Sequence, residues 1–92
     1  MAEPQTLLSS HKELAATNTA ERLTSESNIV LAVSIKAKKS NAAVVYIGPE
    51  AINAEGYYLE PGESLEFDVL DMSRIYVYGK EKDIVVYLGL HP

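Results

Sequence analysis

The sequence predicts an all-β protein: a small, jelly-roll-like antiparallel β-sandwich of six to seven strands with an extended N-terminal arm. Apolar and polar residues alternate in several short runs, as they do in strands with one buried and one solvated face. Turn residues separate these runs about every ten positions, which is the spacing of a sandwich or small barrel. A length of 92 residues without an internal repeat fits one domain.

The arm is expected over residues 1–18, and the sandwich domain over residues 19–92. The arm contains several small residues, Ala, Ser and Thr, and few large apolar ones. Ser10 and Glu13 have the spacing of a capping box, which would open a short helix. The favoured alternative is an extended segment that becomes ordered against a neighbour, because chain ends are poorly fixed unless they dock. The large apolar side chains of the arm are candidate interface residues: Leu7, Leu8 and Leu14.

Alternation and turn chemistry also predict the strands of the domain. The strand signal is weak in residues 19–24 and strong in residues 29–38. In the second segment, one of the two faces ends in lysines. A single helical turn is expected within residues 70–73. The last strand carries apolar residues at every second position from Ile84 to Leu90, so these share one face. Apart from the segments beside Pro61-Gly62, the expected strands are 19–24, 29–38, 43–48, 74–79 and 84–90.

The most strongly predicted turn is Pro61-Gly62. Proline presets φ at about −65° at the first central residue of the turn. Glycine accepts the positive φ that a type II turn requires at the second central residue. Residues 57–60 and 64–69 alternate on either side of this turn. The pattern predicts a hairpin or a tight corner between two sheets, with Pro61 and Gly62 as structural turn residues.

The charge distribution is uneven. The net charge is −5, which disfavours a nucleic-acid partner. Seven acidic residues and no basic residue lie between positions 40 and 73. The basic cluster Lys36, Lys38 and Lys39 is therefore a candidate interface that could steer copies of the chain, or the chain and its partner, into register. The simpler alternative is a solvated acidic face.

No constellation for chemistry is visible, so the chain is not expected to be an enzyme. There is no cysteine, and the two histidines, His11 and His91, lie near opposite ends of the sequence. Neither a metal site nor a cofactor site is expected, since the spacings of a catalytic triad, a phosphate loop and a calcium loop are all missing. The start of the chain does not resemble a signal peptide, and the apolar run 29–35 is too short to span a bilayer. We expect a soluble protein made in a cytoplasm.

Tyrosine is the main aromatic residue, with six copies and no tryptophan. Most are expected to be half-buried partners across neighbouring strands. Tyr57 and Tyr58 differ, because adjacent strand residues face opposite sides and one of the two must leave the core. They are candidate interface or ligand-stacking residues.

Three segments, in this order and spacing, resemble small β-sandwich virion proteins of tailed bacteriophages: NAAVVYIG (41–48), LEPGESL (59–65) and RIYVYG (74–79). The likeness covers roughly residues 28–90. It implies a structural protein that decorates or cements the capsid, binds the major capsid protein and sits on the virion surface after synthesis in the host cytoplasm. The small size and the absence of cysteine already favour a homo-oligomer, and the resemblance favours a trimer. The acidic net charge and the lack of a long apolar run indicate no nucleic-acid or membrane partner.

Two other functions are open. A carbohydrate-binding module of a tail or baseplate would use the exposed tyrosines as stacking platforms, although no tryptophan is present. A head–tail connector component would form a ring of higher order than three. Glycan binding distinguishes the first alternative, and the oligomeric state distinguishes the second.

Overall fold

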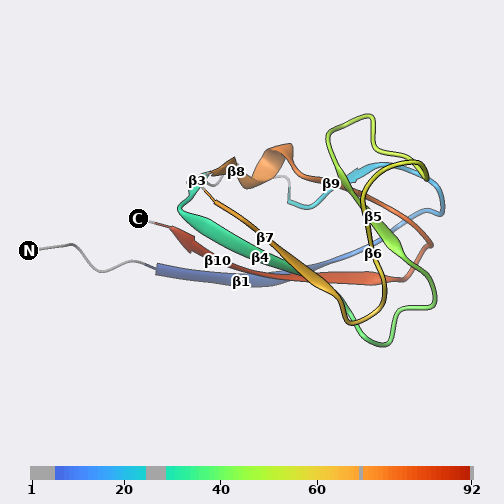
Figure 1. Ribbon diagram of the computed structural model, residues 1–92, viewed down its shortest axis with the longest axis horizontal. Helices are drawn as coiled ribbons and strands as arrows, with labels where there is room; N and C mark the ends of the chain where they lie inside the picture. The colour runs from blue at the N-terminus through green and yellow to red at the C-terminus, as the bar shows by residue number, and fades with distance from the viewer. Residues whose placement is uncertain (1–5, 25–28, 69, 92) are drawn as a thin grey trace, which may run out of the picture.

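The computed structural model describes residues 6–24, 29–68 and 70–91, which form two facing antiparallel sheets (Figure 1). The first sheet has the strand order β1 (Thr6–Glu13), β10 (Ile84–His91), β4 (Ala32–Ala37), β7 (Ser64–Phe67). The second sheet has the order β2 (Glu21–Arg22), β9 (Tyr76–Tyr78), β5 (Val45–Gly48), β6 (Tyr58–Leu59). A small pair, β3 (Ile29–Val30) with β8 (Leu70–Asp71), and a 3₁₀ turn, η1 (Met72–Arg74), complete the described elements.

These two strand orders are those of a jelly roll, a sandwich in which a long antiparallel hairpin is folded over so that its strands contribute to both sheets. The predicted fold class is therefore confirmed. The strand number is higher than predicted, because the two sheets contain four strands each. A single helical turn was predicted within residues 70–73; the structure has a 3₁₀ turn, η1, at Met72–Arg74, after the short strand β8 at Leu70–Asp71.

The N-terminal segment differs from its predicted arrangement. Residues 6–13 are extended, as favoured, but they pair along their whole length with β10, from Thr6 opposite His91 to Glu13 opposite Ile84. They belong to the sandwich, and the capping-box helix is wrong for them. The physical reason is that β10 has a second edge beside the one that pairs with β4. A polar strand can bond the N–H and C=O groups of that edge as well as an apolar strand can. The rest of the predicted arm up to residue 5 lies outside the described residues.

The core fills the space between the two sheets. In β4, Val33, Ile35 and Ala37 are buried and alternate with more exposed residues, which confirms the predicted period of two. The core cluster comprises Leu14, Leu23, Val30, Val33, Ile35, Ala37, Val45, Ile47, Leu59, Met72, Ile75, Val77, Val85 and Tyr87.

The Pro61-Gly62 turn forms a corner between the sheets, leading from β6 in the second sheet to β7 in the first. Gly62 has a φ of 91°, the left-handed conformation that glycine adopts without strain. Its N–H donates to the Ala37 carbonyl (2.8 Å), which ties the corner to the end of β4. Of the two predicted arrangements, the corner is the one observed.

One end of the sandwich is fastened by buried polar contacts. The Asp83 carboxylate accepts hydrogen bonds from the backbone N–H groups of Ala42 (2.9 Å) and Ala43 (3.0 Å). The Asn41 side chain accepts from the N–H of Ile84 (2.8 Å) and donates to its carbonyl (2.9 Å). Asp83 is 5% exposed, so these contacts replace water for both chain segments.

Candidate interaction surface

The outward face of the first sheet carries an apolar stripe along β10. Val85 and Tyr87 point into the core, so the alternate residues of this strand point outward. We call these outward residues the β10 stripe: Ile84, Val86, Leu88 and Leu90. Leu88 is 48% exposed, and Leu7 from β1, opposite Leu90, is 68% exposed. A strand that is apolar on both faces is typical of a sheet covered on both sides.

The surface beside the stripe is hollowed and is bordered by polar groups. A shallow hollow of about 260 Å³ is lined by Leu7, Leu88 and Leu90 together with residues of β4 and β7, including Glu66. Ser9 lies opposite Leu88 on one side, and Ser34 lies opposite it on the other. An apolar centre with a polar border is the usual composition of a protein interface.

Residues of two predicted interface groups, the basic cluster and the leucines of the arm, lie on this face. Lys36 pairs with Val86 of the stripe, and Lys38 donates its backbone N–H to the Ile84 carbonyl. Leu7 lies at the opposite end of the same face. Lys39 lies in the following turn, close to Gly62.

The other two leucines of the predicted arm point inward. Leu8 is half-buried against the core, and Leu14 is 1% exposed within it. Leu14 is therefore a core residue. Leu88 and Leu90 were not among the predicted candidates, although the unbroken apolar run 84–88 is typical of a strand with two apolar faces.

Tyr57 and Tyr58 lie away from this face, at the second sheet, and are 67% and 51% exposed. The Tyr58 ring packs edge-on against Tyr46, which packs likewise against Tyr78; the centroids are 5.9 Å apart in both pairs. These rings form a tyrosine row across β6, β5 and β9, as expected for cross-strand partners. Beside the row, Tyr57, Tyr58, Glu55 and Glu63 line an open hollow of about 590 Å³.

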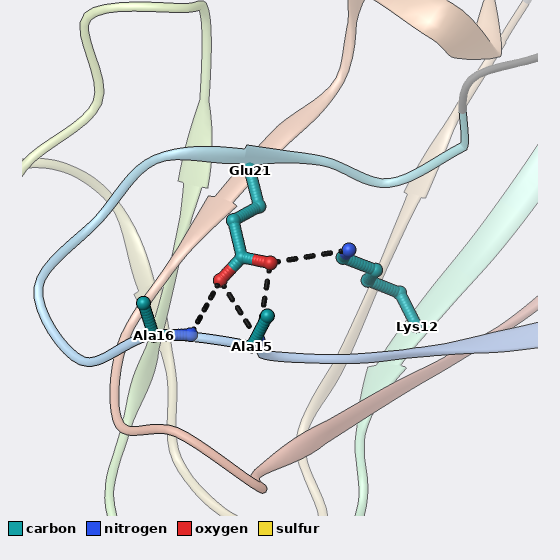
Figure 2. A network of polar contacts seen from close by, with 4 residues as sticks. All are labelled: Lys12, Ala15, Ala16 and Glu21. Carbon is teal, nitrogen blue, oxygen red and sulfur yellow. Dashed lines mark hydrogen bonds and ion pairs between the residues drawn. The ribbon is translucent and has the colours of Figure 1, made fainter.

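The end of β1 is held in place by hydrogen bonds and an ion pair to Glu21 (Figure 2). The Glu21 carboxylate accepts hydrogen bonds from the N–H groups of Ala15 (3.0 Å) and Ala16 (3.2 Å) and pairs with the Lys12 ammonium (3.2 Å). Burial alone would raise the pKa of Glu21, but these backbone hydrogen bonds and the Lys12 charge outweigh it and lower the pKa. The contacts join the end of β1 in the first sheet to β2 in the second.

Because the pKa of Glu21 is lowered, the stabilisation from its contacts depends on pH in the acid range. The stabilisation is present above the ordinary glutamate value of 4.5 and is lost as the pH falls through the folded-state pKa. We expect Glu21→Gln to lower the free energy of unfolding by about 1 kcal/mol at neutral pH. In urea titrations repeated from neutral to acid pH, the wild-type and variant curves should converge as the pH falls. A constant difference at every pH would contradict this assignment.

The described residues show no other cluster with evident chemistry. Among them, no group of three or more His, Asp or Glu side chains is placed to hold a metal ion. Likewise, no helix in the described ranges is long and apolar enough to cross a membrane. Comparison of the chain with protein-family models, curated proteins and solved structures found no match.

Proposed function

We propose that this chain is a non-enzymatic virion structural protein of a tailed bacteriophage, which decorates the capsid and stabilises it by binding the lattice of the major capsid protein. The observation that carries this proposal is the β10 stripe, a partly exposed apolar surface on a jelly roll, with Leu88 at 48% exposure. Jelly rolls occur widely in viral capsid proteins and lectins, which supports the proposal by analogy of fold. The resemblance in segments 41–48, 59–65 and 74–79 supports the same function.

The stripe is suited to a flat partner such as a capsid shell. Its apolar residues are aligned along a straight strand, and their exposed area is removed from water when a partner covers them. Lys36 and His11 lie on either side of Val86 and could contact acidic groups of that partner. Self-association is part of the proposal, because a small domain without disulfides gains stability from a second buried surface.

Co-sedimentation of the purified chain with undecorated phage heads tests this function. Leu88→Glu places a charge in the centre of the stripe, and we expect it to weaken head binding at least about tenfold. Tyr57→Glu is the matched control, since it adds the same charge at an exposed apolar residue of the other sheet. The proposal fails if the wild-type chain does not bind heads, or if both variants bind as the wild type does.

The tyrosine row favours one second candidate, a carbohydrate-binding module. Aromatic rings stack on the apolar faces of sugars, and Glu55 and Glu63 could accept hydrogen bonds from sugar hydroxyls in the adjoining hollow. A glycan array probed with the wild type and with Tyr58→Ala tests this candidate. Binding of a neutral glycan that is lost in Tyr58→Ala would favour it over capsid decoration.

A further inference from the structure

Among the described residues, strand β1 is paired along one edge only. It is the outermost strand of the first sheet, and no strand of the described residues pairs with its other side. With eight residues it is the longest outermost strand in the two sheets, compared with four residues in β7 and two each in β2 and β6. An exposed edge of this length is a template for another extended chain.

The positions of the unpaired backbone groups follow from the hydrogen bonds at the end of the strand. Leu14 donates its N–H to the Asp83 carbonyl (2.9 Å), so its backbone faces the β10 side. On the far side of β10, Lys38 donates to the Ile84 carbonyl (3.0 Å), so Ile84 faces β4 and makes no ladder bond with Glu13. Because backbone direction alternates along a strand, the N–H and C=O groups that face outward belong to Leu7, Ser9, His11 and Glu13.

Two of the features that usually protect an edge, a bulge and a proline, are missing from β1. Its pairing with β10 runs through consecutive residues without a bulge, and the segment contains neither proline nor glycine. A lysine often guards an exposed edge. Here Lys12 is the lysine, and its ammonium is bound to Glu21 within the same chain (3.2 Å). The edge is therefore straight and open to pairing.

We propose that β1 pairs antiparallel with β1 of a second copy of this chain, about a two-fold axis at Ser10. In this register Leu7 pairs with the partner's Glu13, and Ser9 pairs with the partner's His11. Every outward N–H and C=O of the strand then has a partner. The antiparallel direction also sets Lys12 beside the partner's Leu8, whereas a parallel pair in register would set Glu13 beside the partner's Glu13. The same edge in both copies makes the contact self-complementary.

The pairing joins the first sheets of two copies into one continuous sheet, with both β10 stripes on the same side. The inference goes beyond the proposed function and holds for the isolated chain. A two-fold pair also differs from the trimer implied by the resemblance, so the stoichiometry of the purified chain distinguishes the two arrangements.

Ser9→Pro tests the proposal, because proline removes only an N–H that faces away from β10. Proline is tolerated at such a position of an edge strand, so the fold should persist. Ser9→Ala, which keeps the N–H, is the matched control. Sedimentation equilibrium should give a dimer for the wild type and Ser9→Ala, and a dissociation constant at least about tenfold higher for Ser9→Pro. A wild-type monomer or trimer, or equal dimerisation of both variants, would overturn the proposal.

Amide hydrogen exchange of the wild type gives a second readout that needs no variant. The amides of Leu7, Ser9 and His11 should be protected at high protein concentration and become exposed on dilution. The amides of Leu8 and Ser10, which face β10, should stay protected at both concentrations. Rapid exchange of the Ser9 and His11 amides at every concentration would contradict the pairing. This measurement decides the proposal even if Ser9→Pro fails to fold.

Discussion

Replacing Leu14 by alanine is expected to lower the free energy of unfolding by about 3 kcal/mol, as measured by urea denaturation at neutral pH. Leu14 is 1% exposed and belongs to the core cluster between the two sheets. Its truncation removes buried apolar surface and leaves a cavity, because the backbone at this point is held by bonds to Asp83 and Lys82.

The control for this prediction is Leu7→Ala in the same strand segment. Leu7 is 68% exposed, so in dilute solution its truncation should change stability by less than about 0.5 kcal/mol. If Leu14→Ala were as stable as Leu7→Ala, the segment before residue 15 would not be packed in the sandwich, and the arrangement of β1 described above would be wrong.

Asp83→Ala is expected to have a similarly large effect, about 3 kcal/mol of stability lost. The substitution removes the acceptor for the N–H groups of Ala42 and Ala43 at a site that water reaches poorly. Glu81→Ala is the control, since Glu81 is an exposed acid in the same loop and its backbone N–H, which the substitution keeps, donates to the Thr17 hydroxyl (3.0 Å). Equal urea midpoints for the two variants would show that the Asp83 contacts contribute little.

Much of the sandwich could be predicted from the sequence, because its strands carry local signals. The alternation in residues 32–37 and the Pro61-Gly62 turn depend on neighbours within a few positions, and both were found as predicted. The predicted strand 29–38 is instead divided at Leu31 into β3 and β4, and Val30 is buried where Leu31 was expected to be. The wrapping into a jelly roll follows from the order of these strands and turns.

The first strand could not be predicted because its signal is not local. Its residues, TLLSSHKE, have no clear alternation, and the backbone of β10, more than 70 positions away, is what orders them. Leu14 was assigned to an interface for the same reason: without β1 in the sheet, nothing in the sequence places this leucine in the core. Asp83 likewise belongs by sequence to a charged loop, and only the approach of residues 41–43 makes it structural.

The candidate surface was predicted in part. Leu7 and Lys36 were selected separately, and their common face depends on the register of β1, β10 and β4, which single residues do not specify. The β10 stripe did have a signal, the apolar run 84–88. It was overlooked because the prediction considered only every second position from Ile84 to Leu90, whereas Val85 and Tyr87 make the opposite face of β10 apolar too and are the residues that enter the core.

Cryo-electron microscopy of tailed-phage heads, with and without the added chain, tests the proposed function most directly. The proposal predicts additional density at symmetric positions on the outer surface of the capsid, with the β10 stripe toward the shell. Heads that carry no such density, or density of this chain confined to the tail, would contradict it.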